Sequence, residues 1–137
     1  MTDIVYEVES NLDTYEFIDV LNKSTLGERR PVDDLSRIKM MCENANLIVT
    51  ARMDGKLIGV ARSITDFTYC TYLSDLAVDK DYQKNGIGKR LIEETKKQAP
   101  QAKLILLSAP AAIDYYPKIG MKKHDYCFIL DDIRELK

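Results

Sequence analysis

The chain has 137 residues, with 20 basic and 22 acidic side chains and a formal net charge of -2. This length suits one domain, residues 1–137, that buries a hydrophobic core. The near balance of charge excludes a general attraction to nucleic acid or to an acidic membrane, and no apolar run reaches the roughly 18 residues of a membrane span. The sequence therefore predicts a folded, water-soluble domain without a nucleic-acid or membrane partner.

The N-terminal stretch and the cysteines indicate a compartment. The opening MTDIVYEVES has neither the basic nor the apolar region of a secretory signal. Cys42, Cys70 and Cys127 form no CxxC pair, and His124 is the only histidine, so we expect neither a metal site nor a disulfide framework. We expect the cysteines to be small buried residues, His124 to lie in a turn or at the surface, and the protein to reside in a reducing cytoplasm.

Strand and helix patterns alternate along the first part of the chain. Residues 3–10 alternate in polarity as a strand does, and residues 14–24 place apolar side chains at helical spacing. A second helix is expected after Pro31, with Asp33 or Asp34 as its cap. The chain thus begins with one strand and two helices.

A hairpin and a third extended run follow. Residues 46–64 are two apolar runs around Asp54-Gly55, where glycine accepts the positive φ that a primed hairpin turn needs. Residues 69–78 are rich in β-branched and aromatic side chains, as strands are. This run leads directly into a glycine-containing stretch.

The last third of the chain continues the alternation. An amphipathic helix is expected after Gly88 and should end at Pro100. Residues 102–108 are typical of a buried strand, a short helix should stop near Pro117, and residues 122–130 predict a final strand. The predicted order is βααβββαβαβ, which places the chain in the mixed α/β class.

Residues 83–89, QKNGIGK, form what we term the glycine loop. A loop entering a helix exposes backbone N–H groups, and the helix dipole favours an anion there. Gly86 and Gly88 remove side chains where a phosphate or pyrophosphate would approach the backbone. The side chains that can add donors or positive charge are Gln83, Lys84, Lys89 and Arg90. The alternative is a plain turn at Asn85-Gly86 with Gly88 as a close contact between helix and strand.

Two segments, in this order, resemble motifs of the GNAT acetyltransferase superfamily. LAVDKDYQKNGIGKRLI is similar to a strand ending in valine followed by (Q/R)-x-x-G-x-(G/A), and the matching residues are Gln83, Gly86 and Gly88. AIDYYPKIGM resembles A-x-x-(L/F)-Y-x-x-x-G-(F/M), and the matching residues are Ala112, Tyr116, Gly120 and Met121. The predicted element order also resembles this family, so the likeness covers nearly the whole chain.

The resemblance implies a central mixed, mostly antiparallel sheet flanked by helices, with acetyl-CoA as cosubstrate and no metal. It implies that the glycine loop grips the pyrophosphate of coenzyme A and that the last residues of the preceding strand pair with the pantetheine arm. The residues implied to bind coenzyme A are Leu76, Ala77, Val78, Gln83, Lys84, Asn85, Gly86, Ile87, Gly88 and Lys89.

The chemistry implied is direct attack of an amine on the acetyl thioester. An ordinary alkyl ammonium must first lose a proton at neutral pH. Asp75 is the leading acidic candidate for this step, and the alternative is that it only orients a neighbour. A backbone amide at or near Val78 would stabilise the oxyanion. The resemblance implies that Tyr116 protonates the leaving thiolate, and the alternative for Tyr116 is a packing role in the core.

The expected function is N-acetylation of a small amine or of an exposed protein amine. The alternative is a non-catalytic module of the same fold that binds acyl-CoA as a ligand or sensor. Only 17 residues follow Gly120, whereas the family usually ends with two strands. The end of the chain therefore forms a very short strand pair, or a second subunit supplies the last strand in a homodimer.

Overall fold

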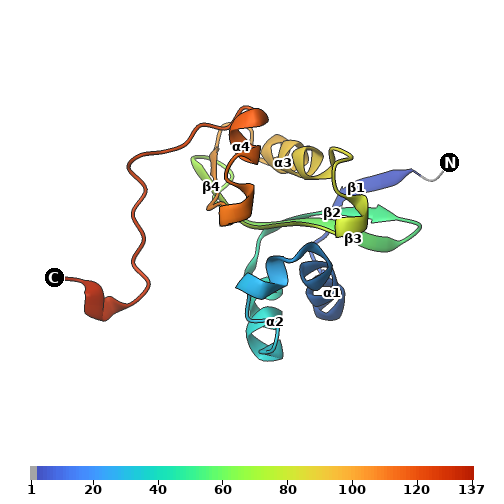
Figure 1. The fold of residues 1–137 in the computed structure, drawn as a ribbon, viewed down its shortest axis with the longest axis horizontal. Coiled ribbons are helices and arrows are strands. Elements are labelled where there is room, and N and C mark those ends of the chain that lie inside the picture. Colours follow the sequence, from blue (N-terminus) through green and yellow to red (C-terminus); the bar gives the residue numbers. More distant parts are fainter. Residues whose placement is uncertain (1–2) are drawn as a thin grey trace. The chain divides into compact units, whose positions relative to one another are not determined.

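The computed structural model describes residues 3–137 and divides the chain into two units, 3–107 and 108–137, which are considered separately (Figure 1). The strands of the first unit are β1 (Ile4–Val8), β2 (Leu47–Met53), β3 (Lys56–Thr65), β4 (Cys70–Val78) and β5 (Lys103–Ile105). Its helices are α1 (Thr14–Ser24), α2 (Leu35–Asn44) and α3 (Ile87–Gln98), with short 3-10 helices η1 (Leu26–Arg29) and η2 (Lys80–Tyr82). The second unit contains η3 (Pro110–Ala112), α4 (Tyr115–Lys118) and η4 (Ile133–Glu135). One domain over 1–137 stays a prediction.

The five strands form one sheet in the order β1-β2-β3-β4-β5. Neighbours from β1 to β4 are antiparallel, whereas β5 runs parallel to β4. Helices α1 and α2 lie on one face of the sheet and α3 on the other (Figure 1). The predicted fold class, a mixed and mostly antiparallel sheet flanked by helices, is confirmed.

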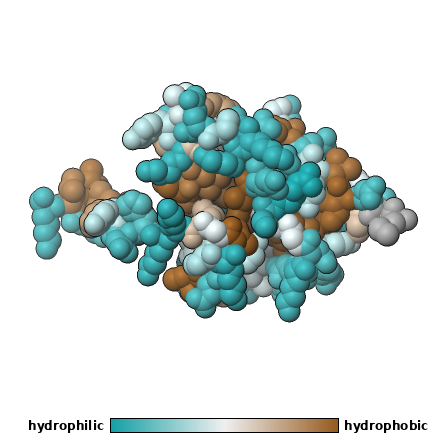
Figure 2. Space-filling model, turned by 90° about the horizontal axis from the view of Figure 1, so that it is seen from above, coloured by the Kyte–Doolittle hydropathy of each residue, from teal (hydrophilic) through white to brown (hydrophobic). Residues whose placement is uncertain are grey.

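Each face of the sheet has its own hydrophobic cluster. On the side of α1 and α2, Phe17, Leu21 and Ile38 pack with buried sheet residues. On the other side, Ile87 and Leu91 of α3 pack against the sheet. On the face seen in Figure 2, polar side chains alternate with apolar areas. The sheet is thus buried on two faces, as a layered α/β unit requires.

The β2–β3 hairpin turns as predicted. Asp54 has φ 53° and Gly55 has φ 80°, so both central residues adopt the positive φ of a primed turn. Farther along β3, Gly59 lets α3 approach the sheet, because a Cβ there would lie only 3.1 Å from Cδ1 of Leu91 and 3.2 Å from Cγ2 of Ile87. Gly55 thus permits the hairpin turn, and Gly59 permits the close packing of α3 on the sheet.

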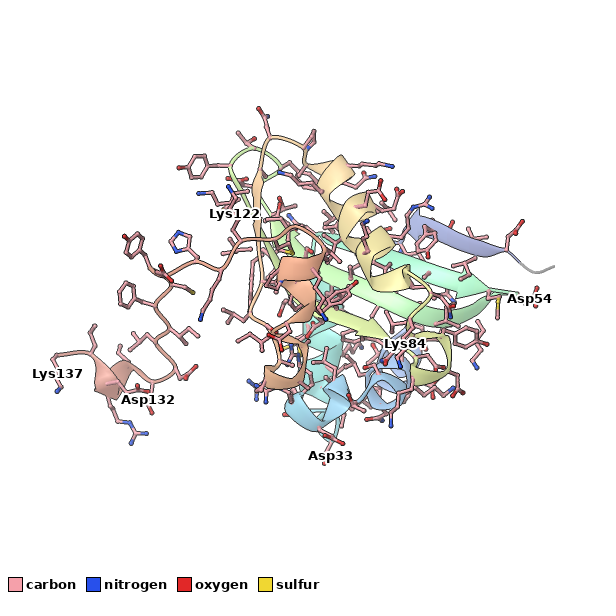
Figure 3. All side chains as sticks on the ribbon, turned by 45° about the horizontal axis from the view of Figure 1, so that its top comes forward. Asp33, Asp54, Lys84, Lys122, Asp132 and Lys137 are labelled. Carbon is pink, nitrogen blue, oxygen red and sulfur yellow. The ribbon has the colours of Figure 1, made fainter. Side chains whose placement is uncertain are left out.

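Asp34, rather than Asp33, caps α2. The Asp34 side chain accepts a hydrogen bond from the Arg37 amide at 3.1 Å, whereas the exposed Asp33 (labelled in Figure 3) precedes the cap. We expect Asp34→Ala to lower the free energy of unfolding by about 1 kcal/mol because an amide at the helix start loses its acceptor. Urea denaturation measures this loss. Asp33→Ala is the matched control, and equal losses in the two variants would contradict the assignment.

The end of the chain departs from the predictions. The strand expected over residues 102–108 is formed only at β5, and it is not buried, since Ile105 is 48% exposed. The strand expected over residues 122–130 is not formed, and Phe128 is 90% exposed. A strand needs the backbone groups of a neighbour to complete its ladder, and residues 108–137 contain no strand that offers them. The strand expected over residues 102–108 is therefore confirmed at Lys103–Ile105 and was wrong in its length and burial, whereas the strand expected over residues 122–130 was wrong.

The thiols and the histidine give a mixed result. Cys42 is buried, and burial raises the pKa of its thiol to about 11. Cys70 and Cys127 are exposed, so the expectation of buried cysteines was wrong for these two. His124 is exposed, and its Nδ1 accepts a hydrogen bond from the Tyr126 amide at 2.9 Å, which confirms the turn role. No helix among residues 3–137 combines the length and the apolar character that crossing a membrane would require.

Candidate active site

Strand β4 has an edge that β5 leaves unpaired. The parallel ladder with β5 involves only Cys70, Thr71 and Tyr72, whereas β4 continues to Val78. In the unit 3–107, residues 73–78 therefore pair with β3 alone. We call the other side of this segment the free edge of β4. Within this segment the carbonyls of Ser74 and Val78 already accept hydrogen bonds from Arg30 and Gln83. The other N–H and C=O groups that face the free edge are available to an extended ligand, as on any open strand edge.

A β-bulge determines which residues face the free edge. Arg62 pairs with Asp75 and Ser63 with Leu73, so Ser74 is the extra residue of β4. Beyond the bulge, the Asp79 amide donates to the Ile58 carbonyl at 2.8 Å and therefore points toward β3. Alternate residues of an antiparallel strand point their backbone groups to opposite sides. Leu76 and Val78 therefore face the free edge, and Ala77 between them faces β3.

The chain from β4 to α3 is held by short-range hydrogen bonds. The Asp79 carboxylate accepts from the Asp81 amide at 2.9 Å, and the Asp79 carbonyl accepts from the Tyr82 amide at 2.9 Å. The Asn85 side chain donates to the Tyr82 carbonyl at 3.0 Å. Nε2 of Gln83 donates to the Val78 carbonyl at 2.9 Å, which ties the glycine loop to the end of the free edge. The loop is thus shaped before any ligand binds.

Gly86 places the start of α3 beside open space. It is the N-cap residue with φ 77°, it has no side-chain cap, and a Cβ built on it would meet nothing within 4 Å. The first backbone hydrogen bond of the helix runs from the Arg90 amide to the Gly86 carbonyl at 3.0 Å. The preceding amides, from Ile87 to Lys89, therefore lie in the turn that has no intrahelical acceptor. With the helix dipole, they form a cradle that suits an anion.

The basic side chains near this cradle differ in their surroundings. Lys84 and Lys89 are exposed, and Lys84 lies on the loop before α3 with φ 68° (Figure 3). Arg90 is directed elsewhere, because its Nε donates to Glu94 at 2.9 Å and its guanidinium lies 4.6 Å from the ring centre of Tyr6. Of the four predicted donors, the two lysines have the freedom to approach a phosphate, and Gln83 serves the loop itself.

Asp75 lies in an unexpected environment. Its side chain is fully buried, and each carboxylate oxygen accepts a hydrogen bond from an arginine: Oδ1 from Nε of Arg30 and Oδ2 from Nε of Arg62. A general base must reach the proton that it removes, and here both oxygens already have charged partners. The base role stays a prediction, and this geometry favours the alternative in which Asp75 orients its neighbours.

Tyr116 belongs to the unit 108–137 and lies in α4. Pro117 follows it inside the same short helix, near the helix start, where its missing N–H removes no hydrogen bond. The Tyr116 carbonyl accepts from the amides of Ile119 at 3.2 Å and Met121 at 3.0 Å. Burial, and to a smaller extent Tyr115, raise the pKa of the Tyr116 phenol. The phenol therefore retains its proton at neutral pH, as a general acid must.

Comparison with known proteins gives the family. The model of the acetyltransferase (GNAT) domain matches residues 24–136. The chain belongs to the GNAT acetyltransferase family. This GNAT chain is 27% identical over 128 residues to an uncharacterized N-acetyltransferase, ycf52, of Pyropia yezoensis. The aligned region covers 88% of this chain and 71% of that protein.

Solved structures agree with the GNAT fold. A GNAT family acetyltransferase from Streptococcus pneumoniae TIGR4 has a TM-score of 0.76 at 16% identity and covers 95% of this chain and all of its own. The aminoglycoside N-acetyltransferase AAC(6')-Iy in complex with CoA has a TM-score of 0.74 at 13% identity, with 97% of each chain covered. Membership of the GNAT family makes acetyl transfer the general activity of this chain.

Sequence reasoning missed the two arginines that pair with Asp75. Arg30 and Arg62 contact Asp75 from positions 45 and 13 residues away. Arg62 did carry a signal, because it is a charged residue inside the apolar run of β3, and a buried charge needs a partner. Arg30 carried none, since an arginine in a polar connection is ordinary.

Proposed function

We propose that this GNAT chain is an acetyl-CoA-dependent N-acetyltransferase that modifies a primary amine of a small molecule or an exposed protein amine. One observation carries the proposal: the free edge of β4 leads directly into the amides at the start of α3. An extended arm ending in a diphosphate matches this sequence of donors. The proposal treats 1–137 as a single domain.

Different groups of the chain would bind the extended arm and the diphosphate of acetyl-CoA. Leu76 offers its N–H and C=O groups and Val78 its N–H along the free edge, because the Val78 carbonyl already accepts from Gln83. Ala77 pairs with β3 and keeps the strand in the sheet. The residues proposed to surround the diphosphate are Gln83, Lys84, Asn85, Gly86, Ile87, Gly88 and Lys89. The amides act as directional donors to the phosphate oxygens, and the two exposed lysines add positive charge.

Acetyl transfer by direct attack makes two further demands. The amide of Val78, or one nearby, donates to the thioester oxygen as it becomes negative. Tyr116 supplies a proton to the leaving thiolate, and its raised pKa keeps that proton in place until it is needed. The amine loses its proton to water or to an acidic group, because the oxygens of Asp75 are occupied.

The experiment is acetyl-CoA binding by calorimetry, followed by thiol release with polyamines, amino acids, aminoglycosides and lysine peptides. Aminoglycosides are included because two fold neighbours are aminoglycoside acetyltransferases. Binding with amine-dependent thiol release supports the proposal. Absence of binding would overturn it.

A second candidate is a non-catalytic acyl-CoA sensor. The observation that favours it is the pairing of both Asp75 oxygens with arginines, which stabilises the ionised carboxylate and makes this acidic candidate a poor proton acceptor. A sensor would bind acetyl-CoA and release no thiol with any amine of the panel. Thiol release above the amine-free rate would exclude it.

We also propose a homodimer with an exchanged last strand. Residues 121–132 form no helix or strand, yet they include exposed Tyr126, Phe128 and Ile129. β5 is the edge strand of the sheet and carries exposed Ile105. The apolar segment of one copy can therefore pair with the exposed edge of β5 in a second copy, which would complete the hydrogen-bond ladder of both. The free thiols agree with a reducing cytoplasm as the proposed location.

Light scattering tests the exchange. We expect a mass of twice 15.7 kDa for the native chain. Phe128→Asp should return the mass to that of one chain, because a buried carboxylate in the exchanged segment is costly. Glu135→Gln, at an exposed position of η4, is the control and should remain dimeric. A native chain that is monomeric at high concentration would contradict the exchange.

A further inference from the structure

The carboxylate of Asp75 joins two arginines that come from different parts of the chain. Arg30 directly follows η1 in the connection between α1 and α2, and Arg62 belongs to β3. The arginine side chains are 22% and 7% exposed, whereas that of Asp75 is inaccessible. We call these three residues the arginine clip.

Further hydrogen bonds extend the clip to the bulge of β4. Nη2 of Arg30 donates to the Ser74 carbonyl at 2.8 Å, and Nη2 of Arg62 donates to the Ser74 hydroxyl at 3.0 Å. Nη1 of Arg62 donates to the Met41 carbonyl of α2 at 3.1 Å. Ser74 and Asp75 are therefore held both by Arg30, from the connection after η1, and by Arg62, from β3.

Arg30 provides the polar attachment of its connection to the sheet. The other hydrogen bonds of this connection are local: the Glu28 amide donates to Thr25, the Arg30 amide to Gly27, and the Asp34 amide to Pro31. Among residues 25–34, Arg30 alone has side-chain hydrogen bonds to a strand in the described structure. Without it, the connection would keep its turns and the apolar contacts of Leu26 and Val32 with the core, and would lose its side-chain hydrogen bonds to β4.

The clip lies where the reacting end of the acyl donor is expected. The cradle at the start of α3 adjoins the Val78 end of the free edge, as the Gln83 contact shows. An arm that begins at the cradle and follows the edge runs toward Leu76 and then toward the bulge at Ser74. The anchored connection would therefore border the acetyl end, where the acceptor amine must enter.

We propose that Arg30, through Asp75 and Ser74, positions the 26–34 connection as a wall of the acceptor site. Asp75 is then a positioning residue that orients Arg30, and it takes no proton from the amine. Both of its oxygens already accept charge-assisted hydrogen bonds, which are the strong ones in a buried setting. This proposal rests on the proposed function, because a wall for an acceptor has meaning only in a transferase.

Hydrogen–deuterium exchange on the full chain tests the anchor without any substrate. In Arg30→Met, the amides of residues 26–34 should exchange at least about tenfold faster, whereas those of α3 should not change. Arg29→Met is the matched control, because Arg29 is exposed and has no side-chain hydrogen bond within residues 3–137. Arg30→Lys should give partial protection, since lysine keeps the charge and loses the planar fork. Equal exchange in Arg30→Met and Arg29→Met would overturn the proposal.

Steady-state kinetics separates positioning from catalysis. With the panel amine that gives the fastest thiol release, Arg30→Met should raise the acceptor KM about tenfold and leave kcat within about threefold. The KM for acetyl-CoA and the acid limb of the kcat/KM profile should be unchanged. A loss of kcat with an unchanged acceptor KM, or a shifted acid limb, would overturn the positioning role. If the native chain turns over no amine, the proposed function fails and the acceptor wall fails with it, while exchange still shows separately whether Arg30 anchors the connection.

Discussion

Gly86→Asp should weaken acetyl-CoA binding by at least about 100-fold, because it places a carboxylate where the diphosphate is expected, and hydrogen bonds to charged groups contribute about 1.5–3 kcal/mol each. A Cβ at this position meets no other atom within 4 Å, so the new carboxylate has room beside the amides at the start of α3, although its backbone at φ 77° is strained. Calorimetry measures the loss of affinity, and circular dichroism checks the fold.

Gly55→Asp is a close control for this experiment. Gly55 has φ 80° and Gly86 has φ 77°, and a Cβ at either position meets nothing within 4 Å. The two variants therefore carry the same new charge and a similar backbone strain, at the hairpin tip and at the cradle respectively. Equal affinities for acetyl-CoA in both variants would reject the cradle.

Tyr116→Phe should lower the rate of thiol release about 100-fold and leave the affinity for acetyl-CoA unchanged, because it removes one proton donor and keeps the ring. The raised pKa of the phenol sets the sign of the pH effect. Since the acid form persists above the ordinary tyrosine pKa, native thiol release should not decline through ionisation of Tyr116 at neutral or mildly alkaline pH. Stopped-flow detection of free thiol across this range measures both effects.

Tyr115→Phe tests the assignment between neighbouring tyrosines. The two rings meet edge to face with centroids 5.3 Å apart, so the two variants remove the same hydroxyl group from neighbouring rings. We expect the Tyr115 variant to retain most of the native rate. A larger loss from Tyr115→Phe than from Tyr116→Phe would move the general-acid role to Tyr115.

The sequence predicted the features that depend on neighbouring residues. The turn at Asp54-Gly55 needs only the positive φ of its own two residues, and helix α1 needs only a local cap and apolar spacing. The glycine loop is likewise a local feature, because its hydrogen bonds join residues a few positions apart. Short-range physics of this kind can be derived from a single chain.

The arginine clip and the chain's end lay beyond such reasoning. Arg30 and Asp75 are 45 residues apart, and only the folded sheet brings them together. The sequence therefore left open whether Asp75 acts as a base or orients a neighbour, and the structure pairs its carboxylate with Arg30 and Arg62. The strand expected at residues 122–130 depended on a partner strand that residues 108–137 do not contain. Its β-propensity was real, yet propensity alone does not complete a ladder.

The extra residue at Ser74 changes, for the rest of β4, which residues point their backbone groups toward β3. Upstream of it, Tyr69 points its carbonyl to β5, where the Lys103 amide binds it at 2.9 Å. If Ser74 paired regularly with β3, the backbone groups of odd-numbered residues would face the β5 side along the whole strand. Ala77 would then present its amide to the free edge in place of Leu76 and Val78. Side chains would exchange faces as well, so Asp75 would turn from the arginines toward α3. The position of this one extra residue therefore decides both which backbone groups of β4 face the free edge and which side of the sheet Asp75 faces.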